Sequence, residues 1–459
     1  MERPAIASIT ASPSPAESVS AAQEPWNAVR PGQRWWLVTV LTLLLILSFL
    51  DRNILKLLVD PLRQDLGITD LQVSLLVGLS FSILYSISCI PFGYAADRHS
   101  RRSLIGGAVF LWSCMSMCCG LAGNYWQLFA ARAGLGIGEA ALQPNAVSLI
   151  RDSFPPNGRA RAFSIFGIGP LVGSAFAMLI GGALFAVAEA GAFDGVPLIG
   201  SLRPWQIALV IPGIAGAILA LLALTLREPP RPPRAGASGP TFRDLFAHMR
   251  AQRRLYLLLF AGPTLWSLAN SGWSAWMAAG MGRTWGLSPG EIGATAGLIG
   301  LVCTPIGLIS LGFLIDRLTR RGNRDAIFHV TLFVQALHML PAMAIFLAPS
   351  VEMMWIAYAA AALIASTVQI LGSAVLTEIT PSHLIGKAAA LYNMVQNFLG
   401  LAIGPTIFAL TATGFSGERA IVPAMMLCYA LFIALASGVI TLLMIERRRT
   451  YKIEGHVDG

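Results

Sequence analysis

Twelve long apolar segments run through this 459-residue chain almost from end to end. Each segment contains at least the roughly 20 residues that a helix needs to cross the apolar core of a bilayer. The segments lie near residues 35–59, 71–94, 103–122, 125–148, 161–188, 205–226, 254–281, 292–315, 326–348, 353–376, 387–412 and 420–445. This pattern predicts an all-α integral membrane protein with twelve transmembrane helices.

The composition excludes a water-soluble protein of this size. Charged residues make up 12% of the chain and hydrophobic residues 55%, with a mean hydropathy of +0.67. An average soluble protein has about 25% charged residues, which it needs to cover its surface. The formal net charge is +9, but on so apolar a chain it indicates a membrane protein, and we expect no nucleic-acid partner. The six cysteines lie in apolar runs and predict neither a disulfide framework nor a metal site.

The basic residues predict how the chain is oriented. If the N-terminus is inside, the loops and tails on that side hold 25 of the 32 Lys and Arg residues. The loops on the opposite side hold four, which are Arg63, Arg203, Arg283 and Arg419. Cytoplasmic loops carry such an excess of positive charge. We therefore expect a multi-pass protein of a bacterial inner membrane, with both termini in the cytoplasm.

Changes in composition predict five parts. The first residues are rich in Ala, Ser and Pro and have no apolar core, which is typical of a flexible tail. The predicted parts are a cytoplasmic tail (1–34), an N-terminal six-helix bundle (35–226), a cytoplasmic linker (227–253), a C-terminal six-helix bundle (254–446) and a second cytoplasmic tail (447–459).

The linker contains a candidate amphipathic helix. Phe242, Leu245, Phe246 and Met249 share one stripe of a helix, with basic residues opposite. Such a helix lies in the membrane interface with its apolar face toward the lipid. An ordinary solvated linker is the alternative.

Two loops repeat the same motif. The loop after the second span reads GYAADRHSRR, and the loop after the eighth reads GFLIDRLTRR, 219 residues further along. A solvated basic loop would explain the arginines but not the repeated Gly and Asp, so we infer duplicated halves. The arginines of these loops can pair across the cytoplasmic seam between the halves. The candidate residues of the two loops are Gly93, Asp97, Arg98, Arg101 and Arg102, and Gly312, Asp316, Arg317, Arg320 and Arg321.

Ionisable residues interrupt the first and fourth spans. Ionisable groups at membrane depth are costly and usually functional. Asp51 and Arg132 lie at similar depths on opposite-running helices, so they are predicted to pair, and Glu139 lies two turns from Arg132. We interpret Asp51, Arg132 and Glu139 as a proton-coupling network, because two carboxylates share one arginine. A structural ion pair that joins two helices is the alternative.

The candidate substrate-binding residues come from both halves. Arg52 and Lys56 are four residues apart on one helical face and could attract an anionic headgroup, or Lys56 could pair with Asp60. The spans of the second half carry no comparable charged cluster. Its candidates are Trp273, Trp276, Asn270, Gln369, Asn393, Gln396 and Asn397. The tryptophans could instead belong to interfacial belts or to helix packing.

The twelve spans, the two halves and the repeated G-x-x-x-D-R-x-x-R-R motif resemble the major facilitator superfamily. This resemblance implies two bundles that rock about a central cavity. It also implies that the candidate residues of the two repeated loops latch the cytoplasmic side when the cavity faces out, so we call them the latch candidates. The Asp51-Arg52 pair, the segment GIGEAALQPNAVSLIRDSFP (136–155) and P-x-x-G-S from Pro170 are similar to the spinster family of lipid transporters. That likeness implies proton-linked movement of lysolipids such as sphingosine-1-phosphate or lysophospholipids. Leu401 after Gly400 departs from the Gly-Asp of eukaryotic relatives, so headgroup selection there does not carry over.

Other classes of function fit less well. The anion–cation symporters, which import small organic anions such as sugar acids, are the nearest alternative, but the second half lacks the cationic groups that they need. An ATP-driven pump would need a P-loop. Gly386-Lys387 has neither the leading Gly nor the following Ser or Thr of that motif, which excludes this class. His329 and His338 lie without acidic neighbours in their span, so no enzyme is expected. We expect protons, a lipid-like substrate and membrane lipids as partners, no cofactor, and a monomer.

Overall fold

The computed structural model describes residues 25–230, 241–364 and 368–454. Most of the predicted N-terminal tail (1–34) and the middle of the linker (231–240) lie outside the described residues, as do residues 455–459 of the second tail. The side chains of Asp97 and Gln369 are also outside the description.

The first half is built from helices that follow the predicted spans. Its elements are η1 (Pro25–Ala28), α2 (Pro31–Leu57), α3 (Val59–Leu66), α4 (Asp70–Ser74), the π-helix η2 (Leu75–Leu79), α5 (Ser80–Arg98), α6 (Arg101–Gly120), α7 (Tyr125–Glu139), α8 (Leu142–Ser153), α9 (Pro156–Phe166), α10 (Gly169–Glu189), α11 (Pro204–Leu219) and the 3-10 helix η3 (Ala220–Thr225).

The second half is also entirely helical in its described residues. After α12 (Phe242–Ala251) in the linker come α13 (Arg253–Trp285), α14 (Pro289–Arg320), α15 (Ala326–Leu347), α16 (Val351–Leu363), α17 (Val368–Ile379), α18 (Ile385–Val395), the π-helix η4 (Gln396–Ile403), α19 (Gly404–Ala412) and α20 (Ile421–Glu454). The last helix thus continues into the predicted second tail.

The structure confirms the all-α membrane fold. No strand occurs in the described residues, and nine helices among them are long and apolar enough to cross a membrane. The three other predicted spans correspond to α7 with α8, to α13, and to α16 with α17. Several spans are made of two or more elements because a π-helix or a short break interrupts them.

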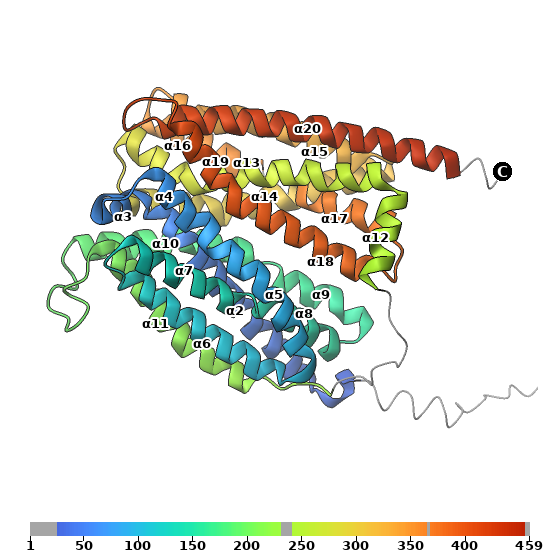
Figure 1. Cartoon of the computed structure of the whole chain (residues 1–459), viewed down its shortest axis with the longest axis horizontal. Helices are drawn as coiled ribbons and strands as arrows, with labels where there is room; N and C mark the ends of the chain where they lie inside the picture. Colours follow the sequence, from blue (N-terminus) through green and yellow to red (C-terminus); the bar gives the residue numbers. More distant parts are fainter. Residues whose placement is uncertain (1–24, 231–240, 365–367, 455–459) are drawn as a thin grey trace, which may run out of the picture.

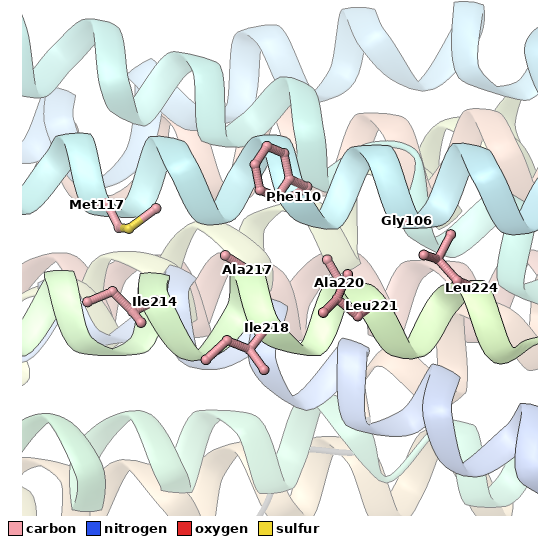
Figure 2. Close-up of a pocket in the computed structure, with 9 residues that line it drawn as sticks. All are labelled: Gly106, Phe110, Met117, Ile214, Ala217, Ile218, Ala220, Leu221 and Leu224. Atoms are coloured by element: carbon pink, nitrogen blue, oxygen red, sulfur yellow. The ribbon is translucent and has the colours of Figure 1, made fainter.

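The outer face of the first half carries a shallow apolar groove of about 460 Å³ between α6 and the α11–η3 segment (Figure 2). Phe110, Ile218 and Leu221 line it and are each more than half exposed. Large apolar side chains that face outward along transmembrane helices are what contact with lipid requires. Its lining contains no ionisable group.

The two halves meet closely at one end and separate toward the other (Figure 1). They converge near α3, α4 and α10, and they diverge toward α9 of the first half and α12 of the second. We call the diverging end, which carries the two repeated loops, the latch side, and the opposite end the clasp side.

Small residues bring α10 of the first half directly against α14 of the second. A Cβ atom added to Gly182 would lie 2.8 Å from the Cα atom of Gly293, and one added to Gly290 would lie 2.9 Å from the Ala186 side chain. Small residues at such positions let the backbones of membrane helices approach closely. The contact between the halves here is therefore made largely by backbone.

On the latch side, the described ion pairs of Arg101 are with residues of the first half, to which it belongs, and not with residues of the second half. Its guanidinium contacts Asp152 at the end of α8 over 2.5 Å and Glu228 beyond η3 over 3.0 Å. The pairing of this arginine across the seam, expected when the cavity faces out, therefore stays a prediction for that conformation. The separation of the halves at this end leaves acidic groups of the same half as its nearest partners.

The second half has a similar cluster, in which one arginine again binds two carboxylates. Arg447 of α20 contacts Asp325, which precedes α15, over 2.8 Å and Glu378 of α17 over 2.6 Å. The remaining latch candidates whose side chains are described do not form buried clusters. Arg98, Arg102, Asp316, Arg317, Arg320 and Arg321 are exposed, and Gly93 and Gly312 are partly exposed.

Replacing Arg101 with methionine is expected to destabilise the protein by about 3 kcal/mol, because Asp152 and Glu228 would stay partly buried without their guanidinium. Arg102→Met, at the exposed neighbouring position, is the matched control and should change little. Thermal unfolding in detergent measures both variants. Equal unfolding temperatures would contradict the role of the Arg101 cluster.

The same cluster predicts a loss of stability in acid. Burial alone would raise the pKa of Glu228, but hydrogen bonds from Arg101 and Ser100 outweigh it and lower that pKa below its ordinary value of 4.5. A carboxyl whose pKa is lowered by folding stabilises the fold above its unfolded pKa, and this contribution disappears as the pH falls through the folded pKa. We therefore expect the difference in unfolding temperature between the wild type and Arg101→Met to shrink below about pH 4.5.

Candidate functional site

Four buried ionisable side chains gather between α2 and α7 of the first half. Asp51 and Arg52 come from α2, Arg132 and Glu139 from α7, and none is more than 9% exposed. Arg52 Nη2 donates to Glu139 Oε2 over 2.7 Å. The Ser48 hydroxyl donates to the same oxygen, also over 2.7 Å. The ion pair of this cluster therefore joins Arg52 to Glu139.

Aromatic rings surround the guanidinium of Arg52. Its central carbon lies 4.9 Å from the ring centre of Phe49, 4.5 Å from that of Phe81 and 5.1 Å from that of Tyr85. Such contacts stabilise a desolvated cation. Arg52, predicted from the sequence to bind substrate, thus belongs to the buried ionic cluster and lines neither of the chambers described below.

The predicted side-chain pair of Asp51 and Arg132 does not form. Arg132 Nη1 donates to the main-chain carbonyl of Asp51 over 3.4 Å, while the Ser116 hydroxyl donates to Asp51 Oδ1 over 3.3 Å. Consecutive residues of a helix point about 100° apart. Asp51 therefore faces α6, and Arg52 faces α7 and takes the place predicted for its neighbour.

Several atoms of this cluster are buried without a described hydrogen-bond partner. They are Asp51 Oδ2, Arg132 Nε and Nη2, Glu139 Oε1 and Arg52 Nε. Buried polar atoms normally have partners because desolvation without a hydrogen bond is costly. The cluster therefore places polar atoms with no described protein partner next to two buried carboxylates.

A polar chamber of about 210 Å³ lies between the halves. Five of the predicted substrate-binding residues line it, namely Lys56, Asn270, Asn393, Gln396 and Asn397. The second half adds the hydroxyl groups of Ser267, Ser271 and Ser274 from α13. The lining combines one ammonium group with amides and hydroxyls, so it can hold a charged or strongly polar group.

A more apolar chamber of about 350 Å³ adjoins it. Trp273 and Met277 of α13 and Met178 of α10 line it, and Asn270 and Ser274 line both chambers. Trp273 also packs against Tyr429, with ring centres 4.7 Å apart, which fixes the indole at the chamber wall. The two chambers together offer a polar and an apolar compartment to one ligand.

Two other predicted residues have different surroundings. Trp276 is 1% exposed and its indole N–H donates to the Pro405 carbonyl over 3.0 Å, so it packs α13 against α19. Lys56 does not pair with Asp60. Its ammonium donates to the Ser274 hydroxyl over 3.1 Å, while Asp60 is bound by Arg283. The side chain of Gln369 lies outside the description.

The clasp side is closed by one arginine of the second half that binds two aspartates of the first. Arg283, at the end of α13, donates to Asp60 of α3 over 2.7 and 3.0 Å and to Asp70 of α4 over 2.7 and 2.8 Å. Its side chain is only 7% exposed. We call these three residues the clasp, since they join the halves at the end opposite the latch loops.

Comparison with known proteins agrees with this architecture. The family model described as Major Facilitator Superfamily matches residues 41–405. The chain belongs to the major facilitator superfamily. The superfamily is one of transporters, so the buried cluster and the chambers are sites in a transport protein.

Curated members of the superfamily resemble parts of the chain. An "MFS-type efflux pump" of Mycolicibacterium smegmatis is 29% identical over 300 residues, which cover 64% of this chain and 65% of the pump. The "D-galactonate transporter" of Escherichia coli is 27% identical over 208 residues, 45% of each protein. The chain thus spans less than two thirds of the length of these relatives.

A solved structure resembles nearly the whole chain. It is the crystal structure of a bacterial homolog of the human lysosomal transporter Spinster, in an inward-facing and unoccupied conformation. The TM-score is 0.73 and the identity 25%, and the match covers 91% of this chain and 96% of that chain. The predicted resemblance to spinster proteins is confirmed.

Sequence reasoning missed some residues at the sites of this major facilitator protein. The serines of α13 lie at positions 267, 271 and 274, near one stripe with Asn270, and this helical spacing was a usable signal. The clasp had none. Asp60 and Asp70 are more than 200 residues from Arg283, and in the sequence each resembles an ordinary loop charge.

Proposed function

We propose that this protein is a proton-coupled secondary transporter that moves an amphiphilic, lysolipid-type substrate by alternating access. The adjoining chambers carry the proposal. One side of the space between the halves is lined by an ammonium group, amides and hydroxyls, and the other by Trp273, Met277 and Met178. A ligand with a polar head and one apolar chain matches both compartments.

The buried cluster supports proton coupling. Within it, Glu139 is held by Arg52 and Ser48, whereas the Asp51 carboxylate has a single described hydrogen bond, from Ser116. Asp51 is therefore the carboxylate that can change its protonation without breaking an ion pair. Arg132, which donates to the Asp51 carbonyl, lies next to it as the charge that responds to the change.

The proposed cycle has the latch side toward the cytoplasm, with both termini there, in a bacterial inner membrane. The clasp joins the halves at the opposite end, and the halves separate on the latch side. This arrangement suits an inward-facing state, the state of the similar spinster homolog. We propose a monomer that works without a cofactor and is surrounded by membrane lipids.

A second candidate is proton-coupled transport of small organic anions such as sugar acids. The polar chamber favours it, because its lining of amides, hydroxyls and Lys56 could hold such an anion without any use of the apolar chamber. A galactonate transporter is among the relatives.

Flux into proteoliposomes distinguishes the two. Purified protein is reconstituted, and entry of a labelled lysolipid or a labelled sugar acid is measured with and without a pH gradient, against protein-free vesicles. We expect gradient-dependent entry of the lysolipid and background entry of the sugar acid. The reverse result would replace the lysolipid with the organic anion as the substrate.

A further inference from the structure

The charges inside the apolar segments do not balance. Asp51 and Glu139 face three basic residues, Arg52, Arg132 and Lys56. Unbalanced charge at membrane depth is costly, and such groups pair with one another or serve a ligand. The site therefore has one positive charge in excess when all five side chains are ionised.

Among the basic residues without a described carboxylate partner, Arg132 and Lys56, only Lys56 lines a chamber, so we assign the excess to it. Arg52 is paired with Glu139, and Arg132 donates to the Asp51 carbonyl. Lys56 lies one helical turn beyond Arg52, and its described partner is the neutral hydroxyl of Ser274 at 3.1 Å. The carboxylate four residues away, Asp60, is bound by Arg283 in the clasp.

Lys56 also faces the place where a ligand would lie. Both Lys56 and Ser274 line the polar chamber, and Ser274 also lines the apolar one. The ammonium group is thus at the junction of the compartments, where the head of an amphiphile meets its chain. A hydroxyl is a weak partner for an ammonium group compared with an anionic oxygen.

We propose that Lys56 selects substrates with an anionic head, such as a phosphate monoester or diester without a balancing ammonium group, and that the anionic oxygen replaces Ser274 as its partner. This inference rests on the proposed transport function and adds to it the sign of the substrate's charge.

The replacement of Ser274 by the anion as the partner of Lys56 has a structural consequence. Lys56 belongs to the first half and Ser274 to the second, so the arriving anion removes a hydrogen bond that joins them.

The test compares two lysolipids of equal chain length in the proteoliposome assay, lysophosphatidylglycerol with a net negative head and lysophosphatidylcholine with a zwitterionic head. We expect the wild type to prefer the anionic lipid by roughly tenfold or more, since a hydrogen bond to a charged group contributes about that factor. Lys56→Met, similar in length and apolar, should lose this preference, so that the ratio of the two transport rates approaches one. Lys56→Arg should keep most of it.

Ser274→Ala is the matched control. It removes the same hydrogen bond between the halves but leaves the ammonium group, so the preference for the anionic lipid should remain. An unchanged preference in Lys56→Met, or equal loss in Ser274→Ala, would overturn the proposal. If the wild type carried only a sugar acid and Lys56→Met abolished that flux, the lysolipid function would fail while the anion-binding role of Lys56 stood.

Discussion

Replacing Asp51 with asparagine reduces pH-gradient-driven transport to the rate seen without a gradient, and leaves exchange of substrate between the two sides of the membrane close to the wild-type rate. This is the result we expect if Asp51 carries the coupled proton. Asparagine has the same shape and can still accept the hydrogen bond from Ser116, but it cannot take up a proton. Flux and counterflow in the same proteoliposomes measure the two quantities.

Glu139→Gln is expected to lose coupled transport as well, but with a cost in stability. It would leave Arg52 buried without a carboxylate, whereas Asp51→Asn breaks no described ion pair. Glu189→Gln, at an exposed position at the end of α10, is the control for the loss of an acidic side chain. Gradient-driven flux of wild-type size in Asp51→Asn would exclude Asp51 as the coupling residue.

Replacing Arg283 with methionine is expected to shift the protein toward a state that is open on the clasp side. The arginine supplies all four described hydrogen bonds of the clasp, and without it the halves lose this link, while Asp70 keeps only Arg63 of its own half as an ion-pair partner. A loss of about 2 kcal/mol, the lower end for truncating one partner of a buried charge pair, changes the ratio of two conformations by roughly 30-fold.

Spin labels at Gln64 of α3 and Glu418, before α20, report the separation of the halves at this end. Both positions are exposed. A longer distance should become more populated in Arg283→Met and stay rare in the wild type. Arg203→Met is the matched control, because Arg203 is an arginine of the same side whose described ion-pair partner, Asp65, lies in its own half. Identical distance distributions in all three proteins would exclude the clasp as a gate.

The membrane fold could be predicted because each helix is encoded locally. A run of about 20 apolar residues specifies a transmembrane helix whatever its neighbours are. The breaks within spans were harder to predict. The π-helix at Gln396–Ile403 and the turn after Glu139 depend on packing against other helices, and the sequence around them is as apolar as elsewhere.

The site could be predicted only in part, because partners depend on how the helices are rotated. Lys56, Asn270 and Gln396 were recognisable as polar residues in apolar runs, and they do line one chamber. Depth along the membrane favoured a pair of Asp51 with Arg132. The rotation of α2, which depth does not reveal, instead presents Arg52 to Glu139.

The contact between α10 and α14 bears on the speed of the cycle. Gly182 and Gly293 meet almost without side chains, so tilting one bundle over the other requires no rotamers to rearrange at this point. Such a contact offers little resistance to the tilting of one bundle against the other. We therefore expect the activation barrier for switching to arise at the ends of the molecule, where charges must separate, and the turnover rate to depend on salt concentration.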